Sequence, residues 1–212
     1  MYSQTNDRQV MNYKLYDSPP SGNCYKVRLL LTQLEIPFDR INVNILQGAT
    51  RVPEFLQKNP AGKVPVLEIQ PDVYLSESGA ILAYLAEGTE YFPRDNRLLQ
   101  TRVLQWLFFE QYSLSPNLSR PRFFISVAKQ QDKFAHLIDH WRNLGYQALD
   151  VMEQHLEKYA FFVNDSYTIA DIALYSYTHV ASEGGYDMSK YPAIQAWCDR
   201  VKSQPKYIGI KE

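Results

Sequence analysis

An α/β domain followed by an all-helical domain is the fold class that this 212-residue sequence predicts. In the first third of the chain, short β-type runs alternate with helical patterns in the order βαβ, α, ββα. After Gly88 every periodic segment has the spacing of a helix. We therefore expect an N-terminal extension at residues 1–11, an α/β domain at 12–88, a linker at 89–96 and a helical domain at 97–212.

The βαβ unit occupies the start of the expected α/β domain. A strand-like run at 13–16 is followed by turn-forming residues and by a helical pattern at 24–34, and a second strand is expected at 38–45. A βαβ unit implies two parallel strands joined by a right-handed crossover. The apolar residues of the helical pattern share one face, and three polar residues lie off it: Lys26, Arg28 and Gln33.

The rest of the domain predicts a short helix, a hairpin and a longer helix. Pro53 suits the first turn of the short helix. Strands at 66–69 and 73–75 flank Pro71-Asp72, a hairpin signal. Ser76 can cap a helix that begins near Glu77. The hairpin adds antiparallel strands to the sheet.

The C-terminal domain contains four helical patterns. One covers 98–112 and is expected to break near Pro116 and Pro121. Others cover 134–158 and begin at Thr168 and at Tyr191-Pro192. In Thr168-Ile-Ala-Asp171 the spacing is that of a capping box, which indicates a structural and not a catalytic role.

Composition excludes several classes of function. Lys plus Arg number 22 and Asp plus Glu number 23, so no strong field favours nucleic acid or an anionic membrane as a partner. No apolar run approaches the roughly 20 residues that span a bilayer. The polar N-terminus lacks a secretory signal, and two cysteines build neither a disulfide framework nor a metal site. A cytoplasmic location without a bound metal is expected.

Four segments resemble the cytosolic glutathione transferase family, in its theta-like and bacterial serine-type classes. They occur in the family's order and cover most of the chain between Asn12 and Tyr207: LYDSPPSGNCYKVR, NPAGKVPVL, LSESGAILAYLAE and SYTIADIAL. The resemblance implies a thioredoxin-like domain that binds glutathione, followed by a helical domain that holds an electrophile. It also implies a homodimer.

Ser21 is the predicted catalytic residue. It stands where the first helix begins, and the unpaired N–H groups and aligned dipoles there stabilise a nearby thiolate. The position matches the activating serine of theta-like relatives. Asn23 is an alternative donor to the sulfur. Cys24, at a helix N-terminus, could instead form a mixed disulfide with glutathione.

The resemblance also suggests which residues bind the rest of glutathione. The Val64-Pro65 bond is expected to be cis, so that the Val64 backbone pairs with the cysteinyl backbone of the tripeptide. At the third helix, Ser78 would receive the γ-glutamyl carboxylate and Glu77 its ammonium group. Three further residues are assigned to the glycine end: Gln47, Arg51 and Lys63.

The electrophile is expected to lie between the active-site turn and the first long helix of the C-terminal domain, in a mostly apolar pocket. The expected lining residues are Phe108, Phe109, Tyr112 and Tyr175, with Phe123 and Phe124 as further candidates. The predicted function is conjugation of glutathione to small hydrophobic electrophiles, as in detoxification. Two alternatives stay open: a thiol transferase or peroxidase that uses Cys24, and a non-catalytic interaction module.

Overall fold

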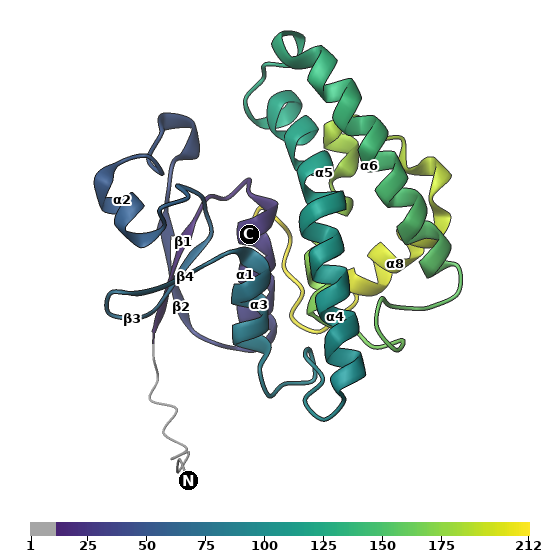
Figure 1. The fold of residues 1–212 in the computed structure, drawn as a ribbon, viewed down its shortest axis with the longest axis horizontal. Helices are drawn as coiled ribbons and strands as arrows, with labels where there is room; N and C mark the ends of the chain where they lie inside the picture. Colours follow the sequence, from purple (N-terminus) through teal and green to yellow (C-terminus); the bar gives the residue numbers. More distant parts are fainter. Residues whose placement is uncertain (1–11) are drawn as a thin grey trace.

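A four-stranded mixed sheet forms the centre of the N-terminal domain in the computed structural model, which describes residues 12–212 (Figure 1). The expected extension at 1–11 lies outside the described residues. The strands are β1 (Tyr13–Asp17), β2 (Phe38–Asn42), β3 (Val66–Gln70) and β4 (Val73–Ser76), in the order β2-β1-β3-β4. β1 runs parallel to β2 and antiparallel to β3, and β3 is antiparallel to β4. This arrangement confirms the thioredoxin-like α/β fold.

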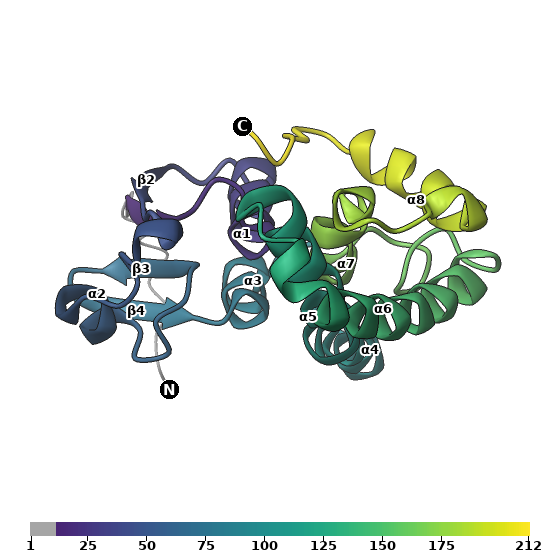
Figure 2. The ribbon, with the colours of Figure 1, turned by 90° about the horizontal axis from the view of Figure 1, so that it is seen from above.

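Two helices separate this sheet from the helical domain. Figure 2 shows α1 (Gly22–Gln33) and α3 (Ser78–Ala86) between the strands and the C-terminal helices, and Figure 1 shows α2 (Pro53–Lys58) on the side away from them. Because α1 is covered on both sides, ten of its 12 residues are buried. The polar residues Lys26, Arg28 and Gln33, which the sequence places off the apolar face, are among them.

The C-terminal domain is helical throughout, as expected. Its longer helices are α4 (Arg97–Phe109), α5 (Ser115–Arg122), α6 (Ala135–Leu156), α7 (Ile169–Thr178) and α8 (Pro192–Lys202). Short 3₁₀ or π segments connect or extend them: η2 (Glu110–Leu114), η3 (Phe123–Val127), η4 (Asp132–Phe134), η5 (Ala181–Gly184) and η6 (Met188–Lys190). Within residues 12–212, none of the helices combines the length and the apolar character that crossing a bilayer requires.

The expected breaks at Pro116 and Pro121 do not occur. Helical structure continues from residue 97 to 127. At η2 and η3 the hydrogen-bond spacing widens to that of a π-helix, and the helix does not end. Pro121 has no N–H to donate to the Asn117 carbonyl one turn earlier. The hydroxyl of Tyr186, 69 residues away, donates to that carbonyl at 2.8 Å. A distant side chain therefore replaces the missing helical hydrogen bond.

Replacement of Tyr186 by phenylalanine is expected to lower the free energy of unfolding by about 1–2 kcal/mol, since it leaves the Asn117 carbonyl without a donor. Urea denaturation followed by circular dichroism measures this loss. Tyr159→Phe is the matched control, because that side chain is 49% exposed and makes no hydrogen bond in the described chain. Equal stability of the two variants would contradict the role of Tyr186.

The predicted capping box is present at the start of α7. The Thr168 hydroxyl accepts from the Ala170 N–H at 3.2 Å, and the Asp171 carboxylate accepts from the Thr168 N–H at 2.9 Å. Asp171 also accepts from the Trp197 indole of α8 at 3.0 Å. Burial raises the pKa of Asp171 to about 6. The residue joins two helices of the core, which is a structural role.

Aromatic rings of α1 and of the helical domain pack against one another at the contact between the two domains. Tyr25 of α1 packs 5.2 Å from the ring of His179, and His179 is stacked on Tyr175 at 4.3 Å. His179 Nδ1 lies 2.7 Å from the Tyr175 carbonyl, so this nitrogen carries the hydrogen. Nε2 is buried without a hydrogen-bond partner in the described chain. Burial lowers the pKa of His179 to about 4.

Acidification is therefore expected to destabilise the protein through His179. Its pKa is near 6.5 when unfolded and about 4 when folded, so the unfolded chain binds more protons between these values. The free energy of unfolding then falls as the pH drops from about 6.5 towards 4. His179→Asn keeps a donor to the Tyr175 carbonyl but does not titrate. Thermal unfolding at pH 7 and pH 4.5 should show a smaller difference for this variant, and identical differences would contradict the assignment.

Candidate active site

Ser21 caps the N-terminus of α1 at the end of the turn that follows β1. Its backbone is extended, and its Oγ accepts from the Cys24 N–H at 3.3 Å. The hydroxyl hydrogen remains available for a second partner. Ser21 therefore offers an O–H donor beside a helix N-terminus, the environment that stabilises a bound anion.

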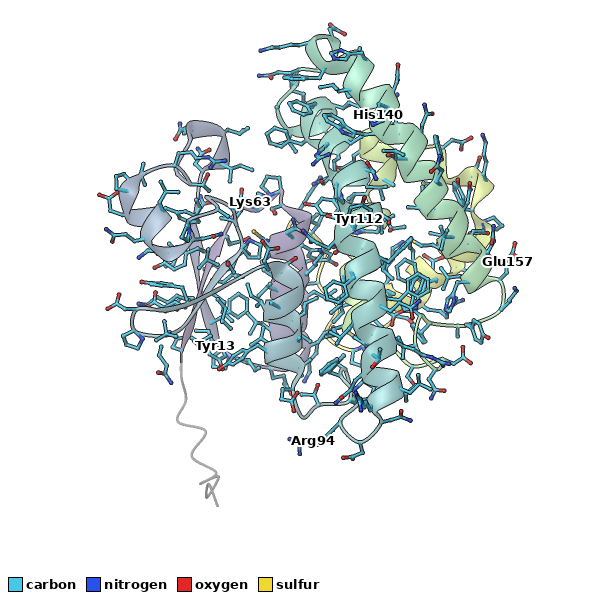
Figure 3. The ribbon with its side chains drawn as sticks, viewed as in Figure 1. Tyr13, Lys63, Arg94, Tyr112, His140 and Glu157 are labelled. Carbon is cyan, nitrogen blue, oxygen red and sulfur yellow. The ribbon has the colours of Figure 1, made fainter. Side chains whose placement is uncertain are left out.

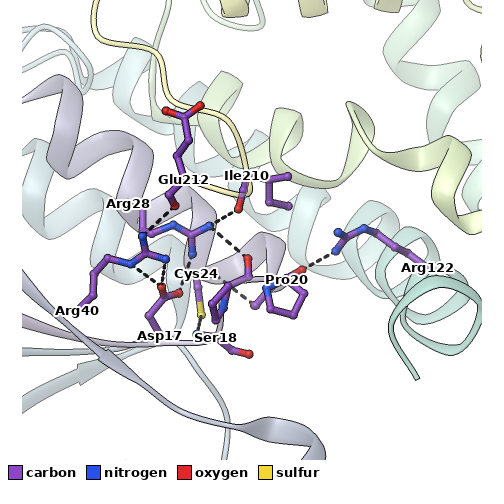
Figure 4. Close-up of polar contacts among 11 residues, drawn as sticks. Asp17, Ser18, Pro20, Cys24, Arg28, Arg40, Arg122, Ile210 and Glu212 are labelled. Carbon is purple, nitrogen blue, oxygen red and sulfur yellow. Dashed lines mark hydrogen bonds and ion pairs between the residues drawn. The ribbon is translucent and has the colours of Figure 1, made fainter. Parts of the chain in front are cut away.

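Two buried arginines hold the turn before Ser21 from opposite sides (Figure 4). Arg28 donates to the Pro19 carbonyl at 3.3 Å and to the Ile210 carbonyl of the C-terminal tail at 2.6 Å. Arg122 of α5 donates to the Pro20 carbonyl at 2.5 Å. These contacts could not be predicted from the sequence, because Arg28 is 182 residues from Ile210 and Arg122 is 102 residues from Pro20. The position of Ser21 therefore depends on both domains.

A small polar groove lies beside this turn and contains most of the residues expected to bind glutathione. Its volume is about 70 Å³. It is lined by Asn23, Asn59, Lys63, Val64, Pro65, Glu77, Ser78 and Gln111. Asn59 and Gln111 were not predicted. The groove combines a lysine, a carboxylate and a helix N-terminus, which are the groups that a zwitterionic ligand requires.

The turn before β3 presents Lys63 and Val64 to the groove. The Val64-Pro65 bond is cis. Asn59 stabilises the turn, because its amide donates to the Lys63 carbonyl at 2.8 Å and its Oδ1 accepts from the Ala61 N–H at 3.0 Å. An Asx turn of this kind is recognisable from the asparagine before Pro60-Ala61.

Glu77 and Ser78 form the opposite wall at the start of α3. The expected cap by Ser76 is absent, because Ser76 ends β4 and Glu77 occupies the N-cap without a side-chain hydrogen bond. Ser78 is buried, and the backbone of Glu77 has φ +66°. Positive φ is unfavourable for a residue with a side chain and is concentrated at ligand sites, where surrounding contacts maintain it. The conformation supports a ligand role for this helix start.

A buried lysine of α1 contacts two residues that line the groove, Asn23 and Ser78. The Lys26 Nζ lies 2.8 Å from Asn23 Oδ1, 3.2 Å from Ser78 Oγ and 2.8 Å from Glu110 Oε1. Since Asn23 Oδ1 faces the ammonium group, the Asn23 amide N–H groups point away from Lys26 and are free to donate. Lys26 was not predicted as a site residue, because its partner Glu110 is 84 positions away.

Gln47 and Arg51 lie outside the groove. Both are exposed, and within residues 12–212 the one hydrogen bond of the Arg51 guanidinium goes to the Ala61 carbonyl, at 3.5 Å. Lys63, the third residue predicted for the glycine end of glutathione, does line the groove. Figure 3 labels Lys63 together with Tyr112 of the helical domain.

A larger aromatic cavity opens on the other side of Ser21. Its volume is about 470 Å³. It is lined by Pro20, Ser21, Ile45, Ser119, Arg120, Arg122, Phe123, Phe124, Val127, Trp141 and Tyr177. Phe123 and Phe124 were candidates from the sequence, whereas Trp141 and Tyr177 were not. Ser21 therefore lies beside the aromatic cavity while Asn23, two residues later, lines the polar groove.

Four residues expected in the electrophile pocket lie elsewhere. Phe108 and Tyr112 are 72% and 87% exposed. Phe109 is half-buried and packs edge-on against Trp106 at 5.3 Å, beside the core. Tyr175 is wholly buried. The expectation assumed that the first long helix turns its aromatic residues towards Ser21, but it is α5 and η3 that approach the turn.

Cys24 is buried with no exposed surface. Its sulfur accepts a hydrogen bond from the Ser18 N–H at 3.5 Å. Burial raises the pKa of the Cys24 thiol to about 12. The thiol is therefore protonated and inaccessible, which opposes a mixed disulfide at this residue. In the described chain, no group of three or more His, Cys, Asp and Glu side chains is arranged to hold a metal ion.

Comparisons with known proteins identify the family of the two domains. The family model described as "Glutathione S-transferase, N-terminal domain" matches residues 11–87, and that for the C-terminal domain matches 123–205. The chain is similar to the crystal structure of a glutathione S-transferase from Pseudomonas fluorescens Pf-5, with a TM-score of 0.92, 46% identity and coverage of 94% and 99% of the two chains.

Two curated relatives carry different descriptions. The disulfide-bond oxidoreductase YfcG of Escherichia coli K12 is 31% identical over 192 residues, 88% of each chain. Glutathione S-transferase F13 of Arabidopsis thaliana is 29% identical over 210 residues, 94% of this chain and 95% of that one. Both domains match the family models in the order in which the structure places them, and the chain belongs to the glutathione S-transferase family.

Proposed function

We propose that this protein is a glutathione transferase that joins the glutathione thiolate to small hydrophobic electrophiles, as a cytoplasmic detoxification enzyme. The observation that carries the proposal is the place of Ser21. It caps α1 and lines an aromatic cavity suited to an apolar molecule, while Asn23, two residues later, lines a polar groove suited to a peptide. A thiolate held there is close to both.

In this mechanism glutathione binds along the groove. Its cysteinyl backbone pairs with Val64, and its γ-glutamyl end is held by Glu77 and by the Ser78 end of α3. Lys63 offers a cation to the glycine carboxylate. The Ser21 hydroxyl donates to the sulfur, with the Asn23 amide as a second donor. The thiolate attacks an electrophile held in the aromatic cavity, and proximity supplies much of the acceleration.

Reduction of disulfides by glutathione is the second candidate, because of the 31% identity to a disulfide-bond oxidoreductase. It would use the same activated glutathione sulfur, since the buried Cys24 is a poor nucleophile. A non-catalytic interaction module is the third candidate, and the intact groove and the Ser21 cap argue against it.

One set of assays separates the three. Retention on immobilised glutathione, followed by rates with an aryl halide, an isothiocyanate, a hydroperoxide and 2-hydroxyethyl disulfide, identifies the reaction. The proposal expects retention and conjugation above the uncatalysed rate. Activity with the disulfide alone would favour the oxidoreductase. Retention without any turnover would favour the interaction module.

We also propose that the protein forms a homodimer, and that Phe108 and Tyr112 lie in its interface. With Leu104 they follow one another at four-residue intervals on α4 and η2, and all three are exposed in the single chain. Large exposed apolar surfaces mark interaction sites. Sedimentation should give a dimer, and Phe108→Glu should shift it to the monomer. A wild-type monomer would contradict this proposal.

A further inference from the structure

The aromatic cavity has flat walls that suit a planar ring. Phe124 is stacked on Phe134 at 4.0 Å and lies nearly parallel to Trp141 at 5.9 Å and 8°. Phe123 meets Phe124 edge-on at 5.3 Å. Aromatic rings prefer offset-stacked and edge-on arrangements over a face-to-face sandwich. A substituted benzene could therefore extend this set of contacts, and the volume of about 470 Å³ lies in the range of small-molecule sites.

Two arginines of α5, Arg120 and Arg122, line the same cavity. In the described chain, the charge of Arg122 is balanced by an ion pair and that of Arg120 is not. Arg122 pairs with Glu183 at 2.7 Å and donates to the Pro20 carbonyl. Arg120 is exposed, and its guanidinium lies 5.4 Å from the centre of the Trp141 ring. No ion pair within residues 12–212 includes Arg120. A cation without an ion-pair partner among the described residues therefore borders a cavity whose lining includes four aromatic rings.

We infer that the electrophile of this enzyme is an aromatic molecule that carries an anionic group, and that Arg120 binds this group. The inference rests on the proposed function. A guanidinium binds a carboxylate or sulfonate through two parallel hydrogen bonds, which fixes the orientation of the ring. With the anionic end at Arg120 and the ring among Phe123, Phe124 and Trp141, the reactive carbon at the other end is directed to the Ser21 side of the cavity.

The test uses two electrophiles that differ in one charge, 4-chloro-3,5-dinitrobenzoate and 4-chloro-3,5-dinitrobenzamide. In both, the glutathione thiolate attacks the carbon that bears chlorine, the C–S bond forms, and the C–Cl bond breaks as chloride leaves with the electron pair. The thiol proton has passed to solvent when the thiolate formed. Each rate is divided by the uncatalysed rate of the same compound, which removes the intrinsic difference in reactivity.

Arg120→Gln is expected to lower kcat/KM for the benzoate by about 10- to 100-fold, the effect of losing a charged hydrogen bond, and to leave the benzamide unchanged. Arg120→Lys should retain part of the benzoate rate. Arg102→Gln on α4 removes an exposed arginine that does not line the cavity, and should change neither. Equal losses for both compounds in Arg120→Gln would overturn the inference, as would a wild-type enzyme that does not favour the benzoate.

Binding of 3,5-dinitrobenzoate, which has no leaving group, separates this inference from the proposed function. Calorimetry should show weaker binding to Arg120→Gln than to the wild type, by the same 10- to 100-fold. A wild type that binds it through Arg120 but conjugates neither compound would support the inference and contradict the transferase. Conjugation of the benzamide without any effect of Arg120 on 3,5-dinitrobenzoate binding would support the transferase and overturn the inference.

Discussion

Replacement of Lys26 by methionine is expected to lower the free energy of unfolding by roughly 3–5 kcal/mol, the usual cost of removing one partner of a buried ion pair. The Lys26 side chain is wholly buried and that of Glu110 is 3% exposed. In the variant, the Glu110 carboxylate would remain in the interior without its partner 2.8 Å away. Urea denaturation followed by tryptophan fluorescence measures the change.

Two further variants make this prediction specific. Lys202→Met removes a lysine from an exposed pair with Asp199 and should leave stability unchanged. Lys26→Met combined with Glu110→Leu removes both charges and should recover most of the loss, because an apolar pair can replace a buried ion pair. A double variant as unstable as the single one would show that the loss comes from Asn23 and Ser78, the other partners of Lys26.

Replacement of Ser21 by alanine is expected to lower kcat/KM at pH 6.5 by up to about 100-fold, with a difference that closes as the pH approaches 9. A free thiol with a pKa of about 8.5 is only about 1% ionised at pH 6.5, whereas a hydrogen bond and a helix end can keep it mostly ionised. The affinity for glutathione should change little, because the groove residues are untouched. Initial rates over pH 6 to 9 with one aryl halide provide the measurement.

The comparison with other donors identifies the activating group. Ser119→Ala removes a hydroxyl that lines the same cavity on α5, and its pH profile should match the wild type. Asn23→Ala tests the second donor to the sulfur. A displaced profile in Asn23→Ala together with an unchanged one in Ser21→Ala would assign thiolate stabilisation to the asparagine.

Local signals in the sequence were sufficient for the fold and for the polar groove. The capping box at Thr168 and Asp171, the Ser21 cap and the hairpin all depend on residues within a few positions of one another. The groove was recovered because the family motifs preserve the spacing of Lys63 to Pro65 and of Glu77 and Ser78. Short-range geometry is fixed by backbone conformation, which sequence patterns report directly.

The aromatic cavity depended on the tertiary structure. Helical spacing shows that Phe108 and Tyr112 share a face, but it cannot show whether that face meets solvent or Ser21. The π segments at 110–114 and 123–127 also change the helical phase, so Phe123 and Phe124 reach the cavity instead.

By itself, then, the sequence determined the order of the elements, the caps of α1 and α7 and most of the residues that line the polar groove. Only the tertiary structure decided the fate of the charged residues on α1. Lys26 and Arg28 have the pattern of a solvated face, yet both are buried. Lys26 pairs with Glu110, 84 residues away, while Arg28 pairs with the nearby Asp17 and also donates to the Ile210 carbonyl, 182 residues away. The physical reason is that burial of a charge requires a specific partner, and a partner brought near by the packing of two domains leaves no periodic trace in the sequence.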